Sequence, residues 1–540
     1  MFMFRQFVLW VMAVLPWLTL ATTVCFAASD SSRYFKIKVV DDQTGRGVPL
    51  VELRTVNNVR YYTDSNGIVA FYEPGLTGRK VFFSVQSHGY AFPKDGFGFA
   101  GKALDVKEGG NAEIKIKRLN IAERLYRITG EGIYRDSVLA GERAPTRKPL
   151  LNAEVTGQDS AMALPWRGKI YWFWGDTSRV RYPFGQFAMS GATSLPPSEG
   201  GLDPAAGVDL DYFVDAEGFS RKMCPMKAEG MVWIDGILVA PDESGAERMI
   251  GHYARMKSLG EMLEHGLAVW DEKDEVFKKH TEFDLNDKWR CPRGHPIRVK
   301  GGGADYFLFP TPYVTMRVKA DLQHLAVQAR YEAFTCLSPG ARYDKTGSKV
   351  ERDSDGKLIY GWKPNTDPID SGQERELIKA GKIKENEARY QPKDVDGKKA
   401  ISMHSGSINW NPFRKKWILI AVQQFGESSF LGEVWFAEAD SVTGPWLWAK
   451  KIVTHDKYTF YNPVHHPFFD QNDGRTIYFE GTYCNTFSGN PDQTPRYDYN
   501  QVMYRLDLSD PRLPQPLAPV KVTGGGQEPS RSSNGKGNTR

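Results

Sequence analysis

The chain is poor in cysteine, and its few cysteines are not spaced as metal ligands. It has five cysteines among 540 residues, and four of them lie beyond the N-terminal segment without forming a CxxC pair: Cys224, Cys291, Cys336 and Cys484. The spacing therefore gives no indication of a zinc site. Two disulfides are possible in an oxidising compartment, but a chain of this length can bury a core that does not need them.

A concentration of charge of one sign is also missing. The chain has 70 Lys and Arg against 65 Asp and Glu, and the resulting formal charge of +5 is scattered along the sequence. Neither a basic stripe for nucleic acid nor a polybasic membrane tail is present. We therefore expect no nucleic-acid partner.

The N-terminal segment holds a long apolar run. Arg5 precedes the run from Phe7 to Leu20, and small residues follow at Ala27-Ala28. This layout predicts a secretory signal over residues 1–28. Pro16 interrupts the run and no basic stop-transfer cluster follows it, which favours cleavage over a retained anchor. The mature protein is expected to be secreted, periplasmic or extracellular, with no stable membrane span.

Residues 33–118 predict a small β-sandwich, because short alternating stretches are separated by turns such as Ser65-Asn66-Gly67. The segments Thr44-Gly45, Pro49-Leu50-Val51 and Thr63-Asp64-Ser65-Asn66-Gly67 resemble the carboxypeptidase-regulatory or transthyretin-like fold. The resemblance implies an accessory module. Residues 119–150 are interpreted as a connector that begins with a short helix.

Residues 151–515 repeat a theme of paired apolar strands. Hairpin turns are expected at Asp235-Gly236, Asn411-Pro412 and Asp473-Gly474. Five such units predict a five-bladed β-propeller, so the fold class is all-β, with an N-terminal β-sandwich followed by the propeller.

Two segments depart from the repeat. Residues 340–400 are strongly charged and contain one helix-compatible stretch, GQERELIKAGKIKENEA, which predicts an insertion that is either a lid or a solvated surface excursion. Residues 516–540 lack apolar side chains and are expected to be a disordered tail.

Two aspartates flank the first predicted hairpin of the propeller. A turn at Arg167-Gly168 places Trp166 opposite Lys169 and Asp159 opposite Asp176. Opposed residues of an antiparallel pair have Cβ atoms about 4.5–5.5 Å apart, so one carboxylate would raise the pKa of the other. Such a pair suits glycoside hydrolysis. The alternative is that both aspartates only bind loop backbone at turns.

The starts of the innermost propeller strands would converge on one central mouth. The residues expected there, as substrate-binding or supporting groups, are Gln158, Glu229, Asp305, His404 and His466. For the two histidines the alternative is a buried structural role between neighbouring blades, and Glu229 could cap a turn.

The segments TGQDSA and GKIYWFWGDT resemble the opening blade of five-bladed propeller glycoside hydrolases. The most similar family is the one first described as domain of unknown function 4185 and associated with endo-D-arabinanases. ADSVTGPW, residues 439–446, is similar to an outer-strand element of arabinanase and xylosidase propellers. The resemblance implies a secreted hydrolase of an arabinan-like polysaccharide or oligosaccharide. Asp159 and Asp176 would be its catalytic pair, one protonating the glycosidic oxygen and the other attacking the anomeric carbon or activating water.

Two other classes of function remain open. A polysaccharide lyase acting on uronate polymers could use a His or Tyr base, with His252, Tyr253 and Arg255 or His404 as candidates. A non-catalytic carbohydrate-binding protein is the third. No cofactor is implied; a structural cation in the central channel, which His466 could touch, stays open, as do the sugar and its linkage.

Overall fold

The structure is a computed structural model, which describes residues 31–514. The predicted signal and the predicted tail lie outside the described residues. Within residues 31–514 the protein is mostly β, and its α-helices are short: α1 (Arg135–Leu139), α2 (Leu322–Leu325) and α3 (Ser371–Lys379). The four cysteines of this part are all free and buried. No helix of the described chain is long and apolar enough to cross a membrane.

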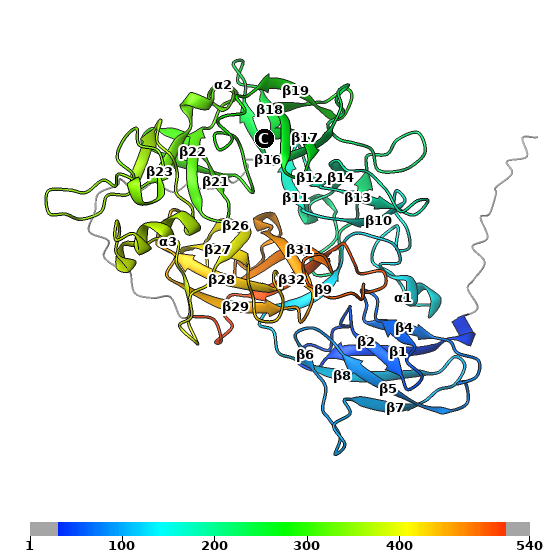
Figure 1. The fold of residues 1–540 in the computed structure, drawn as a ribbon. Coiled ribbons are helices and arrows are strands. Elements are labelled where there is room, and N and C mark those ends of the chain that lie inside the picture. The colour runs from blue at the N-terminus through cyan, green and yellow to red at the C-terminus, as the bar shows by residue number, and fades with distance from the viewer. Residues whose placement is uncertain (1–30, 515–540) are drawn as a thin grey trace, which may run out of the picture.

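Two four-stranded sheets form the N-terminal part (Figure 1). Alternate residues of β1, such as Ile37 and Val39, point into one hydrophobic core, which also receives Leu53 and Phe83 from the other sheet. One sheet comprises β4 (Ile68–Phe71), β1 (Phe35–Asp41), β8 (Asn111–Arg118) and β6 (Tyr90–Ala91). The other comprises β3 (Arg60–Tyr62), β2 (Glu52–Thr55), β5 (Lys80–Gln86) and β7 (Gly101–Asp105).

The connector begins with a strand, β9 (Glu123–Arg127), where the sequence suggested a short helix. All five residues of β9 are buried, because the strand pairs with β32 (Asn500–Asp507) near the other end of the described chain. Helix α1 follows only later. Segments almost 400 residues apart in the sequence therefore share one sheet. The sequence of the strand itself, ERLYR, does not indicate this long-range pairing.

Five further sheets follow one another along the chain, each built mainly of antiparallel neighbours. In strand order, the first sheet comprises β11 (Met162–Trp166), β12 (Lys169–Trp174), β14 (Ser190–Ser194) and β15 (Asp211–Tyr212), and the second comprises β16 (Met231–Pro241), β17 (Glu247–Ser258), β18 (Glu261–Asp271) and β19 (Val276–Glu282). The third comprises β20 (Ile297–Gly301), β21 (Ala304–Pro310), β22 (Val314–Lys319), β23 (Glu332–Thr335) and β24 (Gly361–Pro364). The fourth comprises β26 (Met403–Asn411), β27 (Lys416–Gln423), β28 (Glu433–Ala439), β29 (Trp448–Thr454) and β25 (Lys393–Asp394), and the fifth comprises β30 (Thr459–His465), β31 (Thr476–Cys484), β32 and β9. A separate pair, β10 (Val155–Gln158) and β13 (Thr177–Arg179), lies beside the first of these sheets.

The hairpin predicted at Asp235-Gly236 is wrong. β16 runs through both residues, and the ladder to β17 shifts register between Asp235 and Leu238. Gly236 adopts φ 62°, a left-handed conformation that glycine accepts without steric cost. The two residues therefore form a bulge inside one long strand.

Two of the five predicted strand starts are also misplaced. The third sheet begins with β20, and Asp305 lies beyond the hairpin turn that leads from β20 to β21, opposite Lys300. The fifth sheet begins at Thr459, and the segment Pro467–Phe469 is a 3₁₀-helix. In both cases the first strand of the sheet lies before the apolar run that suggested it.

The charged segment 340–400 packs at the outer strands of two sheets. β24 is the last strand of the third sheet, and β25 pairs with β29 at the edge of the fourth. Helix α3, labelled in Figure 1, lies in this segment. It begins at a capping box of Asp370 and Gln373 and buries Leu377 in a small hydrophobic cluster with Leu337 and Leu358. The predicted helix is confirmed, although it is shorter than the stretch that suggested it.

Candidate functional site

The hairpin between the two aspartates has the predicted register. Met162 lies opposite Phe173 and Trp166 opposite Lys169, with the turn at Arg167-Gly168. Beyond the last ladder pair, the Gly175 N–H donates a 2.8 Å hydrogen bond to the backbone oxygen of Asp159. The hairpin thus brings Asp159 beside Gly175-Asp176.

Asp159 is held by several donors. The hydroxyl of Tyr461 donates to its Oδ2 at 2.7 Å, and Tyr499, Ser160 and the backbone N–H of Asp176 also bond to its carboxyl group. Burial raises the pKa of Asp159, while these donors act in the opposite direction by stabilising the ionised form. The carboxylate of Asp159 therefore receives more hydrogen bonds from the protein than the carboxylate of Asp176 does.

Asp176 has a single donor by comparison. The indole N–H of Trp233, from β16, donates to its Oδ1 at 2.7 Å. Burial raises the pKa of Asp176 to about 6, and the negative charge of Asp159 adds to that shift. The site therefore contains two neighbouring carboxyl groups, one of which holds a proton at mildly acidic pH.

Three residues around the pair have left-handed backbone conformations without being glycine. Ser160 has φ 57°, Asn462 φ 48° and Tyr499 φ 60°. The Asn462 amide donates to Ser160 Oγ at 2.8 Å, and the Tyr499 backbone oxygen accepts from Gln158 N at 2.8 Å. Such conformations cost about 1–3 kcal/mol each and cluster at functional sites. Here they fix the groups that hold Asp159.

Gln158 lies behind the pair and is fully buried. Its amide nitrogen donates to Ser190 Oγ at 2.6 Å, and its amide oxygen accepts from the Tyr212 hydroxyl at 2.7 Å. These bonds occupy both ends of the amide. Gln158 thus anchors the end of β10, directly before Asp159, to the first sheet.

His404 lies at the start of β26 and is exposed. The ladder between β26 and β27 shifts register between Met403 and Ser405, and Met403 lies opposite Gln423. Its surroundings lower the pKa of His404 through partial desolvation, so its imidazole is neutral at neutral pH.

Glu229 and Asp305 are separated from the aspartate pair by their contacts. Glu229 is exposed, and its backbone oxygen accepts from Arg255. Asp305 forms an ion pair of 2.8 Å with Arg298 beside the β20–β21 turn. The structure does not bring these two carboxylates into contact with Asp159 or Asp176.

His466 lies one residue beyond the end of β30, in the wall between the fifth and first sheets. It is 1% exposed, bonds through Nε2 to Glu480 at 2.7 Å and contacts the Trp172 ring at 5.2 Å. Tyr461 and Asn462, nearer the start of β30, contact Asp159 and Ser160 instead.

The proposed lyase groups are engaged elsewhere. Tyr253 donates to Glu264 at 2.6 Å, Arg255 pairs with the same carboxylate at 3.0 Å, and His252 bonds to His265. None of these side chains contacts the aspartate pair, so the structure does not favour the lyase alternative.

Sequence reasoning missed Trp233, Tyr461 and Tyr499. Each lies on a strand or loop of a different unit from the Asp159–Asp176 hairpin, so no local spacing connects them. Asp235, two residues after Trp233, is exposed, yet the surrounding protein raises the pKa of its carboxyl by desolvation. Its carboxylate accepts hydrogen bonds from the backbone N–H groups of Gly236 and Gly294.

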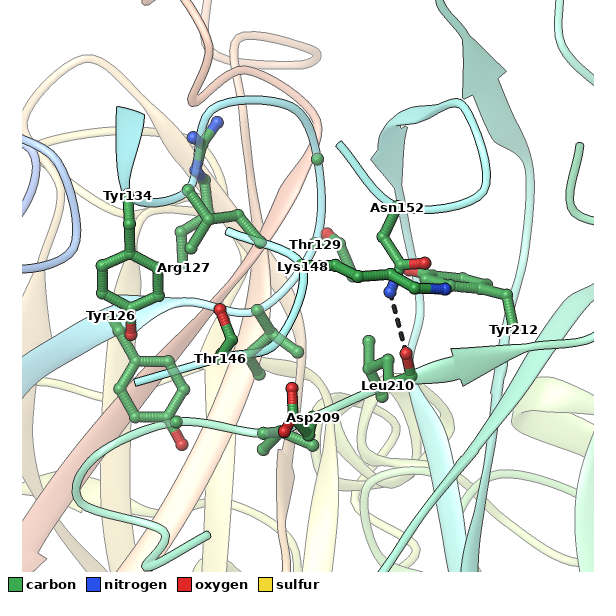
Figure 2. Close-up of a pocket in the computed structure, with 15 residues that line it drawn as sticks. Tyr126, Arg127, Thr129, Tyr134, Thr146, Lys148, Asn152, Asp209, Leu210 and Tyr212 are labelled. Carbon is green, nitrogen blue, oxygen red and sulfur yellow. Dashed lines mark hydrogen bonds between the residues drawn. The ribbon is translucent and has the colours of Figure 1, made fainter. Parts of the chain in front are cut away.

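A separate small cavity lies where the connector meets the first sheet. Figure 2 shows Tyr126 and Tyr134 at one side of it and Asn152 and Tyr212 at the other. Asn152 donates to the backbone oxygen of Leu210 at 2.8 Å. The lining does not include Asp159 or Asp176, and Tyr212 links the two places through its bond to Gln158.

No protein-family model matches the chain, and no curated protein matches it. Among solved structures, an exo-1,5-α-L-arabinanase from a bovine ruminal metagenomic library is 10% identical and aligns over 66% of this chain and 94% of its own, with a TM-score of 0.31. An α-L-arabinofuranosidase from Fusarium graminearum is 11% identical over 72% and 98%, with a TM-score of 0.34. An exo-β-1,3-galactanase from Clostridium thermocellum is 11% identical over 67% and 60%, with a TM-score of 0.32. Scores this low carry no argument about fold or activity.

Proposed function

We propose that the protein is a glycoside hydrolase whose catalytic pair is Asp159 and Asp176. The observation that carries the proposal is the juxtaposition of two carboxyl groups, with the pKa of Asp176 raised to about 6 by burial and by the charge of Asp159. Neighbouring carboxyl groups in unequal environments supply an acid and a base at the same pH.

The environments assign the roles. The pKa of both carboxyl groups is raised, and Asp176, which has one donor and a pKa of about 6, is assigned as the acid that protonates the glycosidic oxygen. Asp159, with donors from Tyr461, Tyr499, Ser160 and the backbone, is the carboxylate that attacks the anomeric carbon or activates water. Partly buried Trp233 lies beside the acid and offers an apolar ring to a sugar face.

The fold supports the proposal when its five successive sheets are read as the blades of a β-propeller. β9 then completes the last blade as its outermost strand, and the loops that hold Asp159 and Asp176 lie at one end of the first blade. The two N-terminal sheets form an accessory β-sandwich in this description. Its turn docks on the rest of the chain, since the Ser137 N–H donates to Asp64 at 2.6 Å and the Tyr497 hydroxyl to Thr63 O.

The substrate is proposed to be an arabinan-like or related glycan, and the protein is proposed to act after export. Both points depend on the motif resemblance of residues 156–177 and on the N-terminal segment. The substrate is tested by an assay that compares furanose, pyranose and uronate polymers.

The test is a cleavage screen of the purified mature protein with three variants. Asp159→Asn and Asp176→Asn are expected to lower cleavage at least about 100-fold, because each removes a proton-transfer or nucleophilic group. Asp305→Asn is the matched control and should leave the rate within about twofold. Wild-type-like cleavage by Asp159→Asn or by Asp176→Asn would show that the pair does not carry the mechanism. An unsaturated uronate product would favour a lyase.

A further inference from the structure

Two histidines and a cysteine meet in the interior beside the second sheet, away from the aspartate pair. His252 lies on β17 opposite Leu267, and His265 lies two residues before Leu267 on β18. Such diagonal partners point to the same face of a sheet, within reach of long side chains. Cys291 reaches them from the segment between β19 and β20.

The potential ligand atoms are close together. His252 Nε2 and His265 Nδ1 are 3.0 Å apart, and with Cys291 Sγ they all lie within 4.8 Å of one another. All three residues are buried. A tetrahedral zinc site with Zn–N near 2.0–2.1 Å and Zn–S near 2.3 Å needs separations of roughly 3.3–3.6 Å. Side-chain movements of about 1 Å close that difference.

The tautomer of His265 suits a metal ligand. Its Nε2 lies 3.0 Å from the backbone oxygen of Asp284, which can only accept, so Nε2 carries the proton. The lone pair of Nδ1 therefore points toward His252. A ligating histidine typically donates its other ring N–H to a carbonyl or carboxylate in this way.

We propose that His252, His265 and Cys291 form a binding site for one divalent zinc ion. Two imidazole nitrogens and a thiolate are a preferred zinc ligand set, and water completes the tetrahedron. Binding releases the thiol proton to solvent, and the proton on His252 Nε2 moves to Nδ1 as Nε2 takes the metal. Zinc binding involves no redox or group-transfer step.

The role that follows is structural. Three residues after Cys291, the Gly294 N–H donates to both carboxylate oxygens of Asp235 at 3.1 Å, which holds the same segment against β16. A zinc ion would attach this segment to β17 and β18 as well. The site would therefore order the segment between β19 and β20 against the second sheet, whether or not the protein cleaves glycans.

The experiment uses the full mature protein, stripped with a chelator and dialysed. Titration with Zn²⁺ should show one ion per chain, and Co²⁺ should produce a thiolate-to-metal charge-transfer band. Cys291→Ser should abolish the band, and His252→Gln should weaken Zn²⁺ binding at least about tenfold. Cys224→Ser, which alters another buried free cysteine, should retain both signals.

A readout on the unmodified chain covers the case in which a variant fails to fold. Zn²⁺ should slow alkylation of Cys291 in partly denaturing buffer, measured by mass spectrometry, without slowing that of Cys224. Uptake of less than a tenth of an equivalent of Zn²⁺, or a bound Co²⁺ without a thiolate band, would overturn the site. Neither result depends on glycan cleavage, so the two proposals fail separately.

Discussion

The indole N–H of Trp233 donates a 2.7 Å hydrogen bond to Oδ1 of Asp176, joining the second sheet to the first at the candidate site. This bond lowers the pKa of Asp176, against the larger upward effect of burial. The acid of the proposed mechanism is therefore tuned by a residue 57 positions away in the chain.

Trp233→Phe tests that tuning. The variant removes one hydrogen bond to the carboxylate, worth about 1 kcal/mol, which corresponds to a rise of roughly 0.7 in the pKa of Asp176. Because the acid must be protonated, the alkaline limb of the kcat profile should move upward by that amount. A limb that stays in place in Trp233→Phe would show that Asp176 is not the acid. Trp410→Phe, on β26, is the control.

The tyrosine donors act on the other limb. Tyr461→Phe removes a donor that lowers the pKa of Asp159, so the carboxylate takes up a proton at higher pH. The acidic limb of the kcat/KM profile should move upward, by roughly 0.5–1 pH unit. Tyr72→Phe, in the N-terminal part, should leave the profile unchanged, and an equal shift in both variants would refute the assignment.

Asp176→Asn is expected to stabilise the fold at alkaline pH. The folded-state pKa of about 6 lies above the ordinary aspartate pKa of 3.8, so ionisation of Asp176 destabilises the folded state increasingly between these pH values and fully above them. The variant should gain about 1–3 kcal/mol at pH 8 and nothing at pH 3.5. Chemical denaturation at the two pH values measures the difference; an equal gain at both would point to another cause.

The buried pair of His466 and Glu480 predicts a large stability effect without a catalytic one. The side chain of Glu480 is fully buried and bonds to His466 at 2.7 Å. His466→Ala leaves that carboxyl without its partner and should cost about 3–5 kcal/mol. Glu480→Gln keeps an acceptor for the imidazole and should cost less. Urea denaturation compares the two, and a loss below 1 kcal/mol in His466→Ala would contradict the expectation.

Strand β9 predicts a sharp boundary for truncation. A chain beginning at residue 119 keeps β9 on the edge of β32, whereas a chain beginning at residue 131 leaves that edge unpaired. An exposed long edge strand promotes aggregation. The longer chain should be monomeric with a lowered melting temperature and the shorter one insoluble, as gel filtration would show. If the two chains are equally soluble, β9 is not needed to cover the edge of β32.

The sequence by itself determined the local pairings. Alternation of apolar and polar residues, together with turn residues such as Arg167-Gly168, fixes which strands form hairpins, because a one-residue slip would turn apolar side chains to the wrong face. For that reason the register between Asp159 and Asp176 could be predicted, and so could the helix that begins near Asp370.

Only the tertiary structure decided what surrounds the pair. Trp233, Tyr461 and Tyr499 reach it from three other segments, β9 joins a strand almost 400 residues away, and His466 lies in a buried wall. These contacts join residues of high sequence separation, and the energies that select them come from packing and burial of whole sheets. Periodicity records which face of a strand is apolar, but it carries no information about which distant face will cover it.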